Sequence, residues 1–343
     1  MLRKTHHSAR RKAALAAASL ALASVSGANA ANQLPLQPDV VFDDSVVLGR
    51  VSDIATDSSG NVYVLDSGFH SIHVYTNDGT FVRSIGGEGD GPGEFRMPRA
   101  LAIDSHDRIY VAGASDRITV MDTVGNGIRT VLRRRNEIIR SMRFGTERHG
   151  TEGDLFLTYL DPENHNTIHR MSQPLEDGEV TLSFCDSYAA GKDVDPRTEQ
   201  VYGGGFIDIA ADGRLWYLQM TPQRVRVFEP DGRVVAEHDV RFQERDAPPE
   251  PDQTRGSVVF TAPPLATKIV ALSDGRFLVT EVYGSETERY SLVDLYDANG
   301  RRQGSEKREL GFAVVWADEK DRVYSVEETE DERIRVVRYV VVE

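Results

Sequence analysis

The residues best suited to chemistry in this sequence are a few possible metal ligands. Seven histidines follow residue 30: His70, His73, His106, His149, His165, His169 and His238. A catalytic zinc needs about three such ligands with an open position, and calcium needs about six oxygen ligands. His165 and His169 are four residues apart, but their segment reads as a turn that enters a strand. Side chains four residues apart lie on the same face only in a helix, so no set of metal ligands is predicted.

The single cysteine, Cys185, rules out an intramolecular disulfide even in an oxidising compartment. Cysteine is among the most buried residue types, so we expect a small core-facing residue and not a nucleophile. The sequence also lacks a Gly-x-Ser-x-Gly elbow. Nucleophilic hydrolysis is therefore not predicted.

A glycine-rich segment, IGGEGDGPGEFRMP at 85–98, is the stretch that could cradle a phosphate. Phosphate loops lead from a strand into a helix whose N-terminus meets the anion. Nothing helical follows Pro98, and no Gly-Lys-Ser or Gly-Lys-Thr closes the loop. We therefore interpret the segment as a connector in which glycines allow sharp turns. Phe95 is expected to fill a seam between two structural units, and Glu94 to accept backbone donors.

These side chains must be positioned by β-structure, because apolar and polar residues alternate after Gln37. One unit recurs, a polar turn followed by a strand around an aromatic residue, as in DSSGNVYVLD (57–66) and DSHDRIYVAG (104–113). The turn residues of six copies are Gly60, Asp107, Gly153, Gly213, Gly275 and Asp321. Their spacings of 47, 46, 60, 62 and 46 residues are typical of propeller blades.

Each copy reads as four strands, with Gly79 and Gly232 in tight hairpin turns that need positive φ. The sixth copy ends after its third strand, 333–342. The N-terminal segment 40–49 is predicted to supply its fourth strand, which would leave no open edge. The predicted fold is an all-β, six-bladed β-propeller over 38–343, preceded by a short linker at 31–37.

The segment IATDSSGNVYVLDSGFHSIHVYTNDGTFVRSIG, followed by GxGxGPGEFxxP, resembles the NHL-repeat six-bladed propellers of bacteria. The resemblance is strong over about 51–132, fair in the fourth and sixth copies and weak in the third and fifth. It implies that the Gly-Pro-Gly-Glu-Phe loop links two blades, and that His70 is a packing residue of the repeat. It also implies that such connections form one face around a central channel.

Charged residues open the predicted first strands, which would line this channel. They are Asp53, Arg99, Arg143, Asp208 and Lys268. Three cations converging at the mouth of an acidic protein would favour an anionic ligand, because a channel focuses the electric field. Alternatively, they pair with the two aspartates and with loop acids and hold the blades together. The register between blades is uncertain by two residues, and both interpretations stay open.

Three connections on the expected mouth face are long, namely 86–98, 185–205 and 241–265. These connections either cap one side of the channel mouth or are loosely ordered surface loops without a function. The histidines do not recur at one position of the predicted blades, as channel ligands from several blades would.

The first 30 residues read as a secretory signal, with basic residues, a short apolar run and a small-residue site at 28–30. Cleavage after Ala30 would leave 35 basic and 54 acidic residues, a net charge of −19. Such a chain repels nucleic acid, and the basic run 133–135 is too short to reverse this. We expect a periplasmic or secreted protein without membrane insertion.

These observations favour an exported scaffold, expected to be a monomer. It would bind a protein, a peptide or a small anionic ligand at the channel mouth, without catalysis and without a cofactor. The alternative is a metal-dependent propeller enzyme of the lyase or lactonase type, with calcium or zinc in the channel. A structural subunit of an envelope assembly is a third possibility.

Overall fold

The structure is a computed structural model, in which Leu34–Glu343 form one compact unit. The described residues are 33–113, 117–132, 138–146, 153–175, 178–188, 190–192, 194–240, 266–284, 289–308 and 311–342. The predicted signal peptide, the basic run 133–135, His149 and the connection 241–265 lie outside them.

Six antiparallel sheets of four strands make up the described chain, each built from consecutive strands except the last. Blade 1 holds β2 (Val51–Thr56), β3 (Val62–Asp66), β4 (Ser71–Tyr75) and β5 (Phe81–Ile85). Blade 2 holds β6 (Pro98–Ile103), β7 (Ile109–Gly113), β8 (Arg117–Met121) and β9 (Gly127–Leu132). Blade 3 holds β10 (Ser141–Phe144), β11 (Leu155–Thr158), β12 (Asn166–Met171) and β13 (Leu182–Asp186). Blade 4 holds β14 (Gly205–Ile209), β15 (Leu215–Gln219), β16 (Arg224–Phe228) and β17 (Val234–Asp239). Blade 5 holds β18 (Ala266–Ala271), β19 (Phe277–Gly284), β20 (Arg289–Tyr296) and β21 (Arg302–Arg308). Blade 6 holds β22 (Phe312–Ala317), β23 (Arg322–Glu328), β24 (Ile334–Val341) and β1 (Leu36–Val41).

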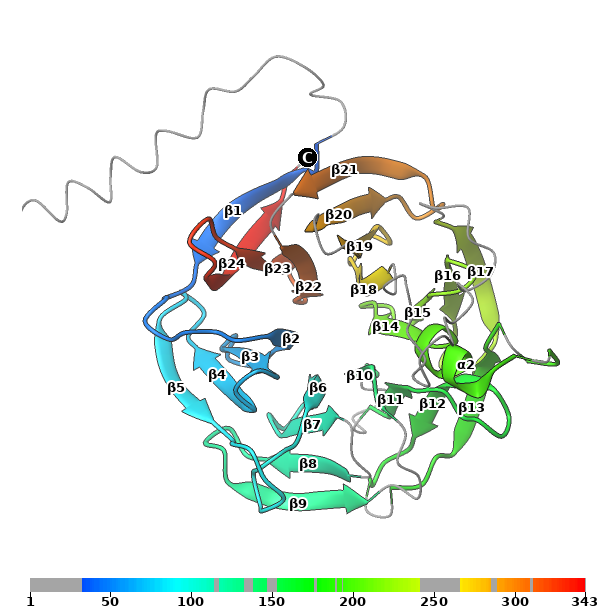
Figure 1. Cartoon of the computed structure of the whole chain (residues 1–343), viewed down its shortest axis with the longest axis horizontal. Coiled ribbons are helices and arrows are strands. Elements are labelled where there is room, and N and C mark those ends of the chain that lie inside the picture. The colour runs from blue at the N-terminus through cyan, green and yellow to red at the C-terminus, as the bar shows by residue number, and fades with distance from the viewer. Residues whose placement is uncertain are drawn as a thin grey trace, which may run out of the picture. The chain divides into compact units, whose positions relative to one another are not determined.

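The blades form a closed ring around the six first strands, as Figure 1 shows. Each of β2, β6, β10, β14, β18 and β22 contacts the first strand of the blade on either side. The predicted six-bladed β-propeller is thus confirmed.

The N-terminal strand closes the ring, but not with the predicted residues. Strand β1 spans Leu36–Val41 and pairs with β24, whereas the sequence predicted 40–49 for this role. Pro38 lies in β1, where an edge position tolerates the missing N–H, and the register shifts between Pro38 and Val40. This proline and bulge break the alternation from which the strand was predicted.

Two hairpin turns take the predicted left-handed conformation, and several of the recurring turn positions share it. Gly79 and Gly232 have φ of 85° and 89°, in agreement with the expected hairpin turns. Two of the recurring turn positions hold aspartate instead of glycine, Asp107 at 58° and Asp321 at 55°. Each carboxylate accepts bonds from a serine of the preceding blade, Ser58 and Ser273 respectively. These aspartates therefore turn the chain and join neighbouring blades.

The hydrophobic core lies in the seams between blades. In the seam between blades 1 and 2, Phe95 is buried against Ile85, Leu101 and Val111. A Cβ atom on Gly86 would lie 2.2 Å from the Phe95 ring, so the glycine makes room for it. The seam-filling role predicted for Phe95 is confirmed. Glu94 accepts a bond from the backbone N–H of Gly91 at 2.8 Å, also as predicted.

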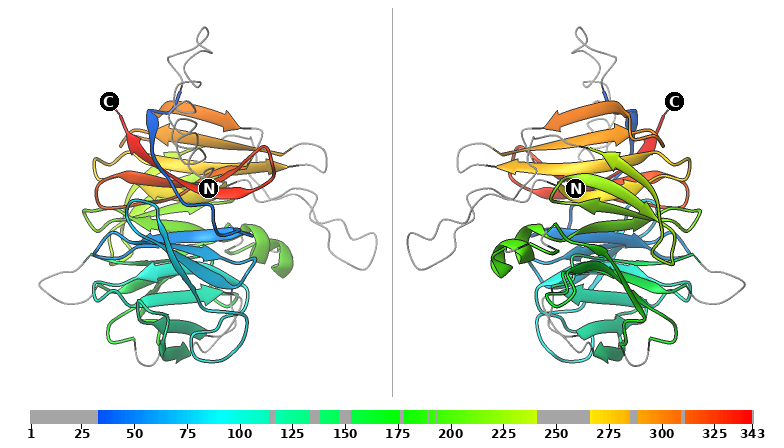
Figure 2. Two further views of the ribbon diagram at one scale, coloured as in Figure 1. Left: turned by 90° about the vertical axis from the view of Figure 1, so that its left-hand side faces the viewer. Right: turned by 90° about the vertical axis from the view of Figure 1, so that its right-hand side faces the viewer.

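One helix was missed by the sequence analysis. Helix α2 (Pro196–Tyr202) lies in the connection from blade 3 to blade 4. Asp195 caps it by accepting the N–H groups of Arg197 and Thr198, and Pro196 occupies the first turn. This pair is a standard start signal for a helix, although seven residues are too few for a visible helical period. Figure 2 shows α2 standing out from one face of the ring.

Candidate functional site

Four charged residues from four blades meet at the centre of the ring. We call Asp53, Arg143, Asp208 and Lys268 the channel quartet; they lie on β2, β10, β14 and β18. All four were candidate ligand-binding residues from sequence. Asp53, Arg143 and Asp208 are buried, and the Lys268 side chain is 13% exposed.

Arg143 holds the channel quartet together. Its Nη1 and Nη2 atoms donate to the two carboxylate oxygens of Asp53 at 3.1 and 3.2 Å. Its Nε donates to Asp208 at 3.3 Å, and Lys268 Nζ lies 3.3 Å from Asp53. Two cationic side chains thus face two carboxyl side chains, and their formal charges sum to zero.

The two remaining blades also contribute to this centre. In blade 2, Leu101 donates its N–H to Asp53 at 3.0 Å and accepts from Arg143 at 3.3 Å. In blade 6, the Trp316 ring lies 4.8 Å from the Arg143 guanidinium, a cation–π contact. Groups from all six blades therefore meet around Arg143 and Asp53, and we call the quartet the channel floor.

Burial and charge act against each other on the titration of these groups. Burial opposes the charged form of Asp53, but Arg143 and Lys268 outweigh it and hold its pKa below the usual value. Burial prevails at Asp208 and raises its pKa, because Arg143 donates only one hydrogen bond to it. Burial also lowers the pKa of Lys268, although Asp53 works against this.

The quartet occupies two levels of the channel, which explains the two-residue uncertainty in the predicted register. Arg143 and Asp208 pair with the aromatic residues Phe156 and Trp216 of their second strands. Asp53 pairs with Leu65, two residues beyond the corresponding aromatic, Tyr63. Two residues of strand correspond to about 7 Å. A long arginine side chain spans this step.

The fifth candidate, Arg99, does not join the quartet. It lies in β6 one residue before Ala100, and its side chain is exposed. In the next blade, Arg140 lies one residue before Ser141, at the equivalent position. Arg99 is close enough to Arg140 to help lower its pKa, although burial is the larger cause. We call Arg99 and Arg140 the mouth arginines, because they precede the floor residues in their strands.

Arg140 was missed by the sequence analysis. Its Nη2 donates to the carbonyls of Gln200 and Val201, at 2.6 and 3.1 Å. These carbonyls lie at the C-terminal end of α2, where a cation is favourable. A comparison of the residues that precede each first strand would have found Arg140, because it matches Arg99 there.

Helix α2 is held at a second point through Glu199. The Oε1 atom of Glu199 lies 2.7 Å from His165 Nδ1 and also accepts a bond from the Ser187 hydroxyl. His165 lies in the turn between β11 and β12, with φ of 59°. The helix is therefore tied to blade 3 at Glu199 and through Arg140.

The other histidines have local roles, and one expectation about them was wrong. His73 and His169 occupy the same position in their third strands, and each lies 2.8 Å from a serine of the fourth strand, Ser84 and Ser183. Histidine thus does recur, although away from the channel. Within the described part of the chain, no three His, Cys, Asp or Glu side chains are gathered as a metal site.

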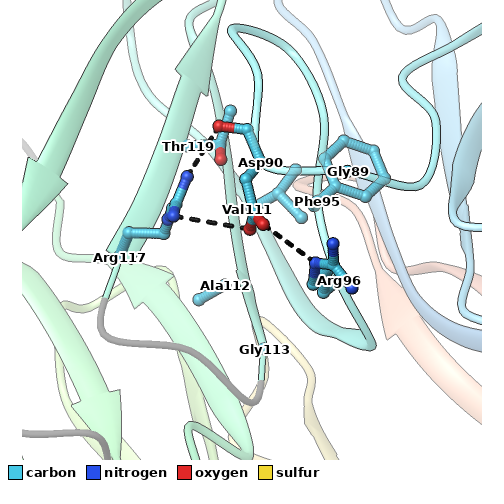
Figure 3. A pocket seen from close by; sticks show the side chains of 9 residues that line it. All are labelled: Gly89, Asp90, Phe95, Arg96, Val111, Ala112, Gly113, Arg117 and Thr119. Atoms are coloured by element: carbon cyan, nitrogen blue, oxygen red, sulfur yellow. Dashed lines mark hydrogen bonds and ion pairs between the residues drawn. The ribbon is translucent and has the colours of Figure 1, made fainter.

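The glycine-rich connector borders a small cavity, shown in Figure 3. Asp90 lies between Arg96 and Arg117, with ion pairs of 3.1 and 3.4 Å. The cavity holds about 10 Å³, which is space for about one water molecule. A nucleotide does not fit there.

Cys185 is half-buried at the end of β13 and packs against the cluster between blades 3 and 4. Its sulfur accepts a bond from Arg226 Nη1 at 3.6 Å. Burial raises the pKa of this thiol, so the nearby guanidinium does not make it reactive.

Comparisons with known proteins support a propeller family. A family model described as a 6-bladed beta-propeller, DUF5128, matches residues 41–125. A solved member of the DUF4221 family from Bacteroides vulgatus is similar with a TM-score of 0.61 at 12% identity, covering 90% of this chain and 99% of that chain. A Bacteroides fragilis protein named as exported reaches 0.61 at 13% identity, covering 93% and 98%. No curated protein matches.

An enzyme also shares the fold. A catalytically inactive virginiamycin B lyase from Staphylococcus aureus, solved with quinupristin, is similar with a TM-score of 0.50 at 14% identity. The match covers 87% of this chain and 83% of that chain. At such identities these likenesses show the fold alone. None of the described helices is long and apolar enough to cross a membrane.

Proposed function

We propose that this chain is an exported, NHL-type propeller scaffold that binds an anionic ligand at the channel mouth without catalysis. The ligand lies against the mouth arginines, above the channel quartet. In this proposal the quartet does not contact the ligand but closes the channel beneath it.

The observation that carries the proposal is the difference in charge pairing between the channel floor and the channel mouth. Asp53 and Asp208 match Arg143 and Lys268 at the floor. Among the described interactions, neither Arg99 nor Arg140 pairs with a carboxylate. Two guanidinium groups on adjacent blades, without a carboxylate among their described contacts, support an anion site at the mouth.

The test is Arg99→Glu, because this side chain is exposed and its replacement does not disturb the core. The probe is a fluorescein-labelled hexaglutamate peptide, measured by anisotropy at low ionic strength. Charge reversal is expected to weaken binding at least tenfold, about 1.4 kcal/mol. The matched control is Arg301→Glu, an exposed arginine in the turn after β20. Equal affinities for the wild type and both variants would refute the proposal.

Export and the domain limits are part of the same proposal. The basic and apolar pattern of residues 1–30 supports a signal peptide, and a similar protein is named as exported. N-terminal sequencing of protein recovered from the periplasm or the medium should begin at Ala31. An intact N-terminus on exported protein would contradict it.

The metal-dependent lyase or lactonase has no specific observation in its favour. A channel metal needs several converging donors, and the described carboxylates at the floor are occupied by Arg143 and Lys268. These contacts favour the binding scaffold over the metal enzyme.

A further inference from the structure

Three large apolar side chains are exposed on the mouth face of blades 6, 1 and 2. Val47 is 71% exposed, Phe69 55% and Met97 52%. Val47 and Met97 lie in connections from a fourth strand to the next first strand, and Phe69 lies between β3 and β4. Because the strands of each blade are antiparallel, both kinds of connection emerge at the same face as the mouth arginines. We call Val47, Phe69 and Met97 the apolar arc.

The other exposed large apolar residues in the described chain lie elsewhere. Val124 is in a turn on the opposite face. The other five are on the outermost strands of blades, namely Val41, Val82, Ile128, Val234 and Val235. Scattered apolar residues on a surface need no explanation, but a group of them beside a charged site marks an interaction surface. The apolar arc is distinguished by its place next to Arg99, which follows Met97 by two residues.

The backbone around the apolar arc is fixed by hydrogen bonds, most of them to the buried Asp66 carboxylate. The Asp66 carboxylate accepts the N–H groups of Gly49 and Arg50 at 2.6 and 2.9 Å, and that of Phe69 at 3.1 Å. This carboxylate ties the Phe69 loop to the chain that follows Val47. The Ser52 hydroxyl then reaches the carbonyl of Pro98 at 3.5 Å, which links this chain to the start of β6.

Met97 is held outward by a strained backbone. Its φ is 45°, a conformation that costs about 1–3 kcal/mol for a residue other than glycine. Its neighbours Phe95 and Pro98 are buried, and its carbonyl fits against Gly113, where a Cβ atom would lie 2.3 Å away. The burial of Phe95 and Pro98 offsets this strain, and the Met97 side chain is left at the surface.

We infer that the mouth face binds an acidic protein segment that also carries an aromatic or large aliphatic side chain. This inference rests on the proposed function and names its partner class. The acidic groups pair with the mouth arginines, and the apolar side chain covers Phe69 and Met97. A small anion would use the first contact but leave the apolar arc uncovered, which is why the geometry favours a protein segment.

The test compares two labelled peptides of eight residues, by fluorescence anisotropy with the purified full-length protein. One is Glu-Glu-Phe-Glu-Glu-Phe-Glu-Glu, and the other has serine at both phenylalanine positions. The phenylalanine peptide is expected to bind roughly tenfold more tightly, as burial of one aromatic side chain implies. Phe69→Ser combined with Met97→Ser should remove this preference and leave the affinity for the serine peptide unchanged.

The matched control combines Ile128→Ser with Val234→Ser, residues that are 52% and 50% exposed on outer strands. This control should keep the preference, and both double variants should unfold at the wild-type temperature. Equal affinity of the wild type for the two peptides, or a preference that survives Phe69→Ser with Met97→Ser, would overturn this inference alone. Binding of neither peptide would overturn the proposed function as well.

Discussion

Removal of Arg143 tests whether the channel quartet joins the blades. Arg143→Met leaves Asp208 with backbone donors alone, the N–H groups of Ala271 at 2.9 Å and of Ile209, and removes the bidentate partner of Asp53. Breaking a buried pair by removing one partner costs about 3–5 kcal/mol. Because Lys268 still faces Asp53 at 3.3 Å, we expect the lower end, about 3 kcal/mol.

The loss is measured as the free energy of unfolding in urea at pH 7, together with the melting temperature. For a chain of this size, about 3 kcal/mol corresponds to a decrease of roughly 6 °C. The exposed Arg301→Met serves as the control and should change the melting temperature by less than about 1 °C.

A double variant separates charge from packing. Arg143→Met with Asp208→Asn removes the buried charge that the single variant leaves uncompensated, so it should be more stable than Arg143→Met alone. Strictly additive losses, or a single variant as stable as the wild type, would refute the argument that these residues act as one network.

Two further predictions concern other buried positions. Burial raises the pKa of Asp294, because it outweighs the hydrogen bond from Ser305 and the attraction of Arg302, which lies 3.9 Å away. The destabilisation by the Asp294 charge is absent below the ordinary pKa of 3.8 and grows as pH rises through that value. Asp294→Asn should therefore raise the melting temperature by about 2–4 °C at pH 7 and by less at pH 4. The exposed Glu330→Gln is the control and should leave the melting temperature unchanged, and a less stable Asp294→Asn at pH 7 would contradict this prediction. Gly86→Ala should cost roughly 2–3 kcal/mol, because φ is 86° and the new methyl group meets Phe95. Gly87→Ala has open space at its Cβ and should cost much less in the same urea titration, and equal losses would show that the Phe95 contact is unimportant.

The predictions from the sequence succeeded where the structure depends on neighbouring residues. The alternation of the repeats gave six four-stranded blades, and Gly79 and Gly232 gave turns with positive φ. The Gly-Pro-Gly-Glu-Phe connector gave a buried Phe95 in the seam between blades 1 and 2. Each of these features follows from a side-chain period or a backbone angle that a short stretch of chain imposes by itself.

The channel quartet depends on relations that no short stretch contains. Asp53 and Arg143 are 90 residues apart, and Asp53 and Lys268 are 215 apart. Bulges shift the register in β2 and β18, whereas none is present in β10 and β14. A bulge inserts one residue and changes the direction of the side chains after it. The list of candidate charges was therefore readable from the sequence, but not the level at which each one lies.

The sequence by itself determined the blades, because a blade is a local pattern repeated six times. Only the tertiary structure decided which charges cancel and which face outward. Arg143 is neutralised by Asp53 and Asp208 across the ring, whereas Arg99 and Arg140 come together on neighbouring blades without a carboxylate among their described contacts. The physical reason is that ring closure, and not sequence spacing, sets the distance between first strands, and charge pairing depends on that distance.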